Sequence, residues 1–311
     1  MMNEITRTVW HGFEAVTLES GEMRVVILPQ LGGKIVSMYD KTHQHEWLVP
    51  PMRPLKQTSY GDDFVSQDMS GWDEMMPTIN RCRWMDAELP DHGEVWSIPW
   101  DVETAVDGLV LSVQGRALPY RFTRSAALTA ANCLELRYTL LNSGQTALAY
   151  LWAAHPQFAV DECTRILLPP EVRSVVNVVD NDPLWGAAGQ VVAWPQASTP
   201  DGQVGNLDRV GRVEQHTCRK VYLPPDQPAA WAALVQEDRH CELRMEWDPA
   251  EVPYLGIWVD EAMYDARAAA ALEPCSGCYD SLESAAANQR ETVLPPGGQC
   301  TWTLRIHFLS R

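Results

Sequence analysis

Several segments of this chain alternate apolar and polar residues with a period of two. In residues 301–308, every second side chain from Trp302 to Phe308 is apolar, and the intervening side chains are polar. The same alternation runs through residues 134–140 and 242–247. Successive side chains of a β-strand point to opposite sides of the sheet, so this pattern predicts half-buried antiparallel strands.

Long helices have little room in this sequence. It contains 22 prolines and 19 glycines, and both residue types interrupt helices. Only residues 265–272 and 281–290 are rich enough in alanine to predict short helices. Strand-like segments separated by turns such as Asn142-Ser143-Gly144 fill the rest, without a linker or an internal repeat. We therefore predict one all-β domain over residues 1–311, built from two large antiparallel sheets packed face to face.

Composition and charge restrict the partners of the protein. The formal net charge is -17, which repels phosphate backbones, so we expect no nucleic-acid partner and no binding to anionic membranes. No apolar run reaches transmembrane length, and residues 1–7 lack the apolar core of a secretory signal. We expect a cytoplasmic protein that is a monomer or a homodimer.

The eight cysteines predict no metal or redox site. Only Cys275 and Cys278 have the C-x-x-C spacing, and a zinc site would need a second pair or suitably spaced histidines. A redox motif would normally open a helix after a strand, and the glycine and tyrosine around this pair do not fit that arrangement. We interpret all eight as reduced cysteines and expect no cofactor.

Thirteen tryptophans is a high count, of which part is expected in an ordinary sandwich core. An aromatic face can stack on the C–H face of a sugar ring, and an indole N–H can bind a hydroxyl group. Core packing is the better interpretation for any single tryptophan. The group Trp72, Trp84, Trp96 and Trp100, interleaved with polar loop residues, is the best candidate for a carbohydrate platform.

Three titratable residues could form an acid/base site. Glu273 stands in Leu-Glu-Pro after the apolar run at residues 254–259, so burial would raise its pKa and make it a usable base near neutral pH. His92 lies in an Asp-His-Gly-Glu turn that has no evident core role. His155 ends an apolar run just before a proline, which predicts an imidazole at the rim of a sheet.

Other charged residues have two interpretations. Residues 70–83 hold Asp73 with a second acid, and Arg81 with Arg83, within a loop-like stretch. Arginine binds hydroxyl or carboxylate groups in a fixed fork, but exposed ion pairs on a loop would give the same sequence. The pair Arg219-Lys220 is more typical of a solvated face.

In their order along the chain, these segments resemble the aldose 1-epimerase (mutarotase) family. The likeness spans nearly the whole sequence and rests on Leu31-Gly32-Gly33, the loop Gly-Trp-Asp-Glu-Met-x-Pro-Thr at 71–78, His92-Gly93, His155-Pro156, Leu255-Gly256 with Trp258, and Leu272-Glu273-Pro274. The galactose enzymes of the family carry Asn-His-x-His-Gly-Gly and Gly-Arg-x-x-Asn-Arg. This chain has only Asp91-His92-Gly93 and Asn80-Arg81-Cys82-Arg83 in those places, so the identity of the sugar stays open.

The resemblance implies an antiparallel β super-sandwich and a role for each matched residue. Glu273 matches the general base that removes the proton from the anomeric hydroxyl, and His155 matches the general acid that protonates the ring oxygen. His92 matches a second histidine that binds the ring, and Arg81 or Arg83 would hold substrate hydroxyls. We also include Asp73 and Trp258 among the candidate substrate-binding residues.

This chemistry would interconvert the α and β anomers of a free monosaccharide by opening and closing its ring. It needs no redox cofactor or metal. It requires a protonated His155 beside an ionised Glu273, and each of these charges favours the other. Neutral hexoses are the default substrates of so acidic a chain. A phosphate or sulfonate sugar would need basic residues to converge, from the set Lys34, Arg81, Arg83 and Arg219-Lys220.

Three other functions fit parts of the sequence. A non-catalytic carbohydrate-binding protein would keep the tryptophan platform without depending on Glu273 and His155, and the presence of both residues favours an enzyme. A glycoside-cleaving enzyme would use Asp73, Glu74 or Glu273 as paired carboxylates, which leaves the histidines without a role. A metal-binding, cupin-like protein is the most distant alternative.

Overall fold

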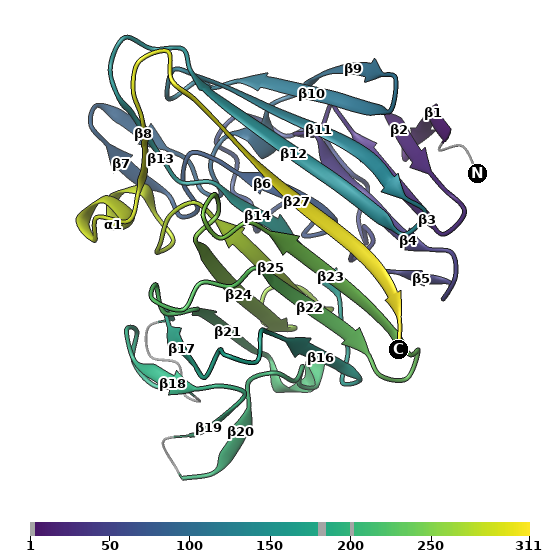
Figure 1. Ribbon diagram of the computed structural model, residues 1–311, viewed down its shortest axis with the longest axis vertical. Coiled ribbons are helices and arrows are strands. Elements are labelled where there is room, and N and C mark those ends of the chain that lie inside the picture. Colours follow the sequence, from purple (N-terminus) through teal and green to yellow (C-terminus); the bar gives the residue numbers. More distant parts are fainter. Residues whose placement is uncertain (1–3, 180–184, 200–201) are drawn as a thin grey trace.

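The computed structural model describes residues 4–179, 185–199 and 202–311. Residues 1–3 of the N-terminal segment 1–7, which we expect not to be a secretory signal, lie outside the described residues. Two large sheets pack against each other in these ranges (Figure 1). The strands of each sheet pair antiparallel, which confirms the all-β prediction. The fold follows from period-two segments that each bury one face.

The larger sheet has thirteen strands and carries the candidate site. Its order is β1 (Glu4–Trp10), β2 (Phe13–Glu19), β3 (Met23–Leu28), β4 (Lys34–Asp40), β6 (Trp72–Met75), β14 (Ala153–Pro156), β25 (Ala268–Cys275), β24 (Tyr254–Glu261), β21 (Thr217–Tyr222), β17 (Ser174–Asn177) and β18 (Val191–Ala193). Two short strands pair alongside, β5 (His45–Glu46) with β4 and β15 (Phe158–Ala159) with β25.

The second sheet has eight strands and includes the three segments with the clearest alternation. Its order is β16 (Thr164–Leu167), β22 (Trp231–Gln236), β23 (Cys241–Trp247), β27 (Gln299–Ser310), β12 (Cys133–Asn142), β11 (Tyr120–Ala130), β10 (Gly108–Gln114) and β9 (Asp101–Ala105). The strands predicted at 301–308, 134–140 and 242–247 are thus confirmed as parts of β27, β12 and β23.

Small elements complete the described part of the chain. Three two-stranded sheets pair β7 (Cys82–Trp84) with β8 (Ala87–Leu89), β13 (Leu148–Tyr150) with β26 (Thr292–Leu294), and β19 (Gln196–Ser198) with β20 (Val204–Asn206). The helical elements are α1 (Leu282–Ala287) and the 3-10 turns η1 (Val95–Ser97) and η2 (Val213–Gln215). None of the helices in the described ranges is long and apolar enough to cross a membrane.

One of the two predicted helices is confirmed and the other is wrong. Helix α1 lies within residues 281–290 and is capped by Ser281, whose Oγ accepts a hydrogen bond from the Ser284 amide at 3.0 Å. Residues 265–272, by contrast, lead into strand β25. All eight residues of β25 are buried, and its neighbours β24, β14 and β15 supply its hydrogen bonds. Packing in the sheet overrides the helical preference of alanine.

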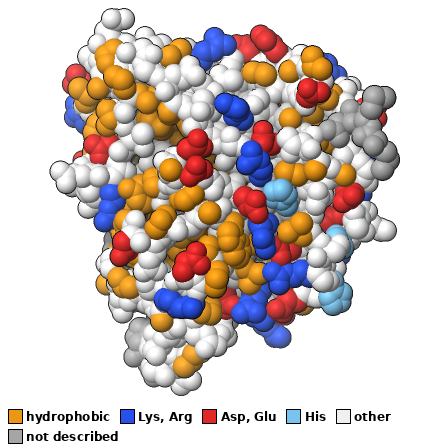
Figure 2. Space-filling view, in the orientation of Figure 1, with side chains coloured by type: hydrophobic (Ala, Val, Ile, Leu, Met, Phe, Trp, Pro, Cys, Tyr) orange, Lys and Arg blue, Asp and Glu red, His pale blue; other side chains and the backbone are white. Residues whose placement is uncertain are grey.

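The alternation divides each strand between two environments. In β25, Ala270 and Leu272 face the core between the sheets, whereas Ala271 and Glu273 point to the other side of the larger sheet. That outer side is covered by loops and carries the candidate site. Figure 2 shows acidic and basic side chains mixed on the visible face of the molecule.

The predicted tryptophan platform is wrong. Trp72 and Trp100 are buried in the core between the sheets, and Trp96 is buried in a separate small cluster. Trp84 is half-buried on the β7–β8 hairpin. These four side chains fill different parts of the protein because burying indole rings stabilises a large sandwich. All eight cysteines are free thiols.

Candidate functional site

Four neighbouring strands of the larger sheet place three titratable side chains and a tryptophan on its outer face. His155 comes from β14, Glu273 from β25, Trp258 from β24 and Lys220 from β21. Their strand neighbours Ala154, Leu272, Ile257 and Val221 all lie in the core between the sheets. The period of two therefore brings together residues that are far apart in sequence.

Glu273 and His155 form a buried pair. The Nδ1 atom of His155 lies 3.0 Å from Oε1 of Glu273, and both side chains are almost fully buried. Gly256 lies opposite Glu273 in the β24–β25 register. A Cβ atom at Gly256 would lie 3.0 Å from Oε2 of Glu273 and 3.2 Å from the Tyr222 ring, so a residue without a side chain leaves room for the carboxylate.

The pKa of Glu273 is lowered, which corrects the expectation of a raised value. Burial alone would raise it, but the charge of Lys220 and the hydrogen bond from His155 lower this pKa to about 2. The Lys220 Nζ atom lies 2.9 Å from Oε2. Oε2 thus accepts from the Lys220 ammonium, and no second donor among the described residues reaches it. Glu273 is thus ionised at neutral pH, with Oε1 paired to His155, Oε2 paired to Lys220, and a further lone pair on Oε2 left for another donor.

The pKa of His155 is also lowered, which corrects the expectation of a protonated imidazole. Burial has the largest effect, and it outweighs the opposing effect of Glu273. His155 is therefore neutral in the free protein at neutral pH, with its Nδ1–H group directed to Glu273. This tautomer leaves Nε2 as an acceptor.

Lys220 is a site residue that our interpretation of Arg219-Lys220 missed. Neither side chain is solvated, because only 10% of the Arg219 side chain and 12% of the Lys220 side chain is exposed, and the two point to opposite faces of β21. Lys220 also lies 3.0 Å from Oδ1 of Asp280, which accepts a hydrogen bond from the Tyr222 hydroxyl at 2.7 Å. Arg219 instead pairs with Glu261. No local feature of the sequence separates the two residues, because both lie in the same strand.

His92 is held close to this pair by a strained turn. Its backbone is left-handed, with φ of 57°, and its amide donates to the Ile79 carbonyl at 2.5 Å. The next residue, Gly93, has φ of 69°, and a Cβ atom there would lie 2.2 Å from the Met76 carbonyl oxygen. The His92 Nδ1 atom is 2.8 Å from Oδ2 of Asp91. Only glycine permits so close an approach of this turn to the chain after β6.

The fourth residue of this turn anchors it to the sandwich. The Glu94 carboxylate is fully buried and accepts hydrogen bonds from the amides of Arg116 and Ala117 and from the Tyr120 hydroxyl, at 3.0, 2.9 and 2.8 Å. A buried carboxylate needs such donors. Glu94 therefore positions His92 without facing the site itself.

Phe64 covers the two histidines. Its ring stacks on that of His92, with centroids 3.9 Å apart and planes at 11°, and meets His155 edge-on at 5.4 Å. It also contacts Trp96 edge-on at 5.1 Å. The His155 ring lies 6.1 Å from that of Trp258. Aromatic rings thus enclose the imidazoles and exclude water from them, which explains the desolvation of His155.

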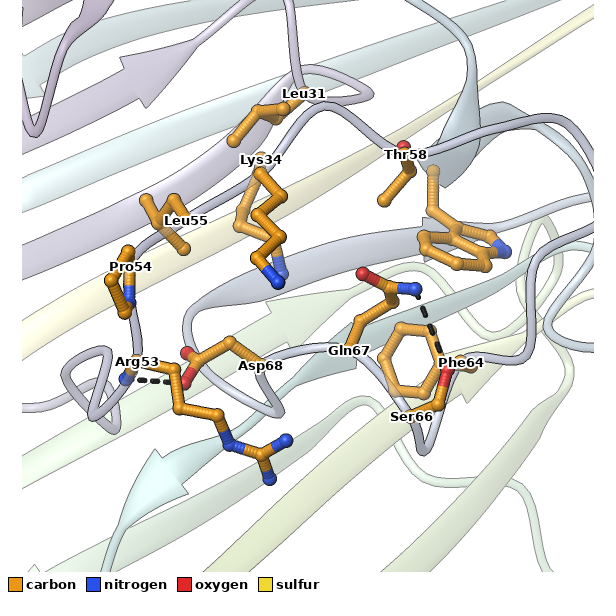
Figure 3. A pocket seen from close by; sticks show the side chains of 12 residues that line it. Leu31, Lys34, Arg53, Pro54, Leu55, Thr58, Phe64, Ser66, Gln67 and Asp68 are labelled. Carbon is orange, nitrogen blue, oxygen red and sulfur yellow. Dashed lines mark hydrogen bonds between the residues drawn. The ribbon is translucent and has the colours of Figure 1, made fainter.

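A cavity of about 230 Å³ adjoins this aromatic cover (Figure 3). Phe64 and Trp96, which contact each other, both line it. The side chains of Lys34, Arg53 and Asp68 line it as well. Lys34 is buried, donates to the Ser70 carbonyl at 2.8 Å, and forms an ion pair with Asp73. Lys56 lines the same cavity, so three basic side chains surround it.

The other predicted binding residues have different positions. Asp73 is paired with Lys34 and lies opposite His155 in the β6–β14 register. Arg81 is exposed but close enough to Asp91 to help lower the pKa of that carboxyl, which burial would raise. Arg83 is exposed on the β7–β8 hairpin, 3.9 Å from Glu88, and does not reach the site.

Glu74 has a structural role, unlike Glu273. It is fully buried on the core side of β6, where Oε1 accepts from Arg124 Nη1 and the Tyr138 hydroxyl, both at 2.9 Å. Its Oε2 accepts from the Trp152 indole N–H at 2.9 Å. Glu74 therefore ties the two sheets together and cannot pair with Glu273 as a catalytic carboxylate. Within the described ranges, no three His, Cys, Asp or Glu side chains are grouped to hold a metal ion.

No protein-family model matches the sequence, and no curated protein is significantly similar to it. Solved structures, however, share its fold over nearly the whole chain. A galactose mutarotase-like protein from Clostridium acetobutylicum superposes with a TM-score of 0.70 at 13% identity, covering 100% of this chain and 99% of its own. One from Lactobacillus casei gives 0.68 at 17% identity, covering 95% and 100%.

A third structure, a provisional aldose 1-epimerase from Escherichia coli K12, gives a TM-score of 0.69 at 18% identity. It covers 99% of this chain and 100% of its own. The fold is therefore that of the galactose mutarotase-like proteins, as the sequence motifs predicted. Identities this low establish the fold alone.

Proposed function

We propose that this protein is an aldose 1-epimerase-like mutarotase that interconverts the α and β anomers of a free sugar. The observation that carries the proposal is the buried Glu273–His155 pair at 3.0 Å, on the outer face of the larger sheet. Opening a hemiacetal requires removal of the O1 proton and donation of a proton to the ring oxygen. A carboxylate and an imidazole side by side can supply both functions.

Glu273 is the base in this proposal. Its carboxylate is buried and ionised, and Oε2 has a lone pair beyond the one that faces Lys220, so it can accept the proton of the anomeric hydroxyl. As O1 loses its proton, the bond from C1 to the ring oxygen breaks and C1 becomes an aldehyde carbon. Rotation about C1–C2 and ring closure then give the other anomer.

His155 is the acid, and it acts in its charged form. The neutral imidazole directs Nδ1–H to Glu273 and has no proton on Nε2 for the ring oxygen. The imidazolium has protons on both nitrogens, and its charge is balanced by Glu273. The ring centroids of His92 and His155 are 5.2 Å apart, and His92 and Trp258 would bind the sugar ring. Arg81, which lies near Asp91, would bind the hydroxyl groups of the sugar.

NMR exchange spectroscopy between α and β anomers tests this proposal. The panel contains neutral hexoses and their phosphate and sulfonate derivatives, because Lys34, Arg53 and Lys56 line the adjoining cavity. We expect accelerated exchange for at least one sugar and a loss of about 10²–10⁴-fold in Glu273→Gln. Glu261→Gln is the matched control, since it also neutralises a buried, ion-paired carboxylate of this sheet.

Each other outcome identifies a specific error. No acceleration for any sugar, with binding retained in a titration, would refute the mutarotase and leave the non-catalytic carbohydrate-binding protein. Full activity in Glu273→Gln would refute the assignment of the base. The same loss in Glu261→Gln would show that the effect comes from damage to the sheet.

A further inference from the structure

Lys220 is the cation at the candidate base, and no motif of the sequence marks it. Its Nζ atom lies between two carboxylates, 2.9 Å from Oε2 of Glu273 and 3.0 Å from Oδ1 of Asp280. Only 12% of its side chain is exposed, so these charges interact with little screening by water. The Tyr222 hydroxyl fixes Asp280 by donating to the same Oδ1 atom at 2.7 Å.

The charges around Glu273 explain what Lys220 can do there. The titratable groups around Glu273 are Lys220 and Tyr222 on β21, His155 on β14, Cys275 on β25, and Asp280 after β25. His92, in the turn before η1, faces His155. Lys220 is the permanent cation among them, because the pKa of Lys220 is raised by Asp280 and Glu273 although burial would lower it. Without Lys220, Glu273 would be a fully buried carboxylate beside a neutral imidazole. Such a group takes up a proton.

Asp280 keeps Lys220 paired when Glu273 becomes protonated. When Glu273 accepts the O1 proton, Lys220 keeps a carboxylate partner at 3.0 Å, so no unpaired buried cation is created. An isolated Lys–Glu pair would oppose this protonation much more strongly. A lysine shared by two carboxylates is therefore compatible with a base that is ionised at rest and protonated during the reaction.

We propose that Lys220, held by Asp280, is a positioning residue that keeps Glu273 ionised and its Oε2 atom in place for the anomeric hydroxyl. This inference rests on the proposed function, because it assigns the role through Glu273. It predicts that Lys220 acts on turnover more than on sugar affinity.

The variants Lys220→Met and Lys220→Arg test the inference, with Arg219→Met as the matched control. Arg219 forms a buried ion pair with Glu261 on the opposite face of the same strand. The first readout is the titration of the Glu273 carboxyl carbon in ¹³C-labelled protein, assigned by its absence in Glu273→Gln. In the wild type we expect titration at about pH 2. In Lys220→Met we expect it above 4.5, since full burial raises carboxyl pKa values by up to about 3–5 units.

The second readout is the pH profile of anomer exchange. Compared with the wild type at the same pH, we expect Lys220→Met to lower kcat at least about tenfold at pH 5 and by a smaller factor at pH 8, with KM nearly unchanged. Lys220→Arg should restore the wild-type profile, and Arg219→Met should not alter it. A Glu273 titration that is unchanged in Lys220→Met, or an equal loss in Arg219→Met, would overturn the inference.

The two proposals fail separately. Wild-type protein that accelerates no sugar refutes the mutarotase, whatever the Glu273 titration shows, and reduces Lys220 to a structural counterion. Wild-type protein that turns over a sugar, with the same kcat and pH profile in Lys220→Met, refutes only the role of Lys220.

Discussion

Replacing Arg124 by methionine tests the cross-sheet network beneath the site. Arg124 Nη1 lies 2.9 Å from Oε1 of Glu74, both side chains are fully buried, and Nη2 donates to the Gly33 carbonyl. The variant leaves the Glu74 carboxylate with two neutral donors, Tyr138 and Trp152. Breaking a buried ion pair from one side costs about 3–5 kcal/mol, so we expect Arg124→Met to lose that much free energy of unfolding.

A double variant separates the charge effect from lost packing. Glu74→Gln alone leaves the Arg124 cation buried without its partner, so it is also expected to destabilise the protein. Glu74→Gln combined with Arg124→Met removes both charges, and replacing a buried pair by neutral groups is often close to neutral. We therefore expect the double variant to recover about 2 kcal/mol or more relative to the sum of the two single changes.

Urea unfolding at pH 5 and pH 7 is the assay, evaluated by linear extrapolation. Burial already raises the pKa of Glu74 although Arg124 opposes it, and removing Arg124 raises that pKa further. The folded variant then binds a proton that the unfolded chain has released. Its stability must therefore rise as pH falls from 7 to 5, by the linkage relation. A loss below about 1 kcal/mol, additive single changes, or the opposite pH trend would refute this reasoning.

Three further predictions concern the site itself. If His155 acts as the charged acid, kcat/KM should fall as pH rises through its lowered pKa, giving an optimum below pH 6.5; a profile that rises over this range contradicts the role. Phe64→Ala should admit water to the imidazoles and raise the pKa of His155, measured by NMR titration of its ring; an unchanged value would show that Phe64 does not desolvate it. Gly256→Ala should displace Glu273 and lower kcat at least about tenfold with little change in melting temperature, and full activity would show that the carboxylate has room to move.

Secondary structure could be predicted from the sequence where the alternation of apolar and polar residues is compatible with only one kind of element. The alternation from Trp302 to Phe308 predicted a strand of the correct phase, because an apolar face must be buried. The alanines of residues 268–271 led to a wrong prediction of a helix. The small side chain of alanine fits an isolated helix, but it also fits a strand that is packed on both faces of its sheet. Only the neighbouring strands decide between the two, and these come from distant parts of the chain.

The residues of the candidate site likewise fall into those that could be predicted from the sequence and those that could not. Glu273, His155 and His92 could be selected from local motifs, and the structure brings them together. Lys220 could not be selected, since its two carboxylate partners lie far along the chain and a neighbouring arginine suggested a solvated pair. The pKa expectation for Glu273 was wrong for the same reason, because it included burial but not the lysine.

The two carboxylates around Lys220 also bear on what an open-chain sugar meets in this site. A ring-opened sugar is an aldehyde, and an uncharged lysine amine adds to aldehydes to form an imine. Glu273 and Asp280 raise the pKa of Lys220, so its nitrogen has no free electron pair at neutral pH. The aldehyde can then turn and close its ring beside a lysine without being captured by it.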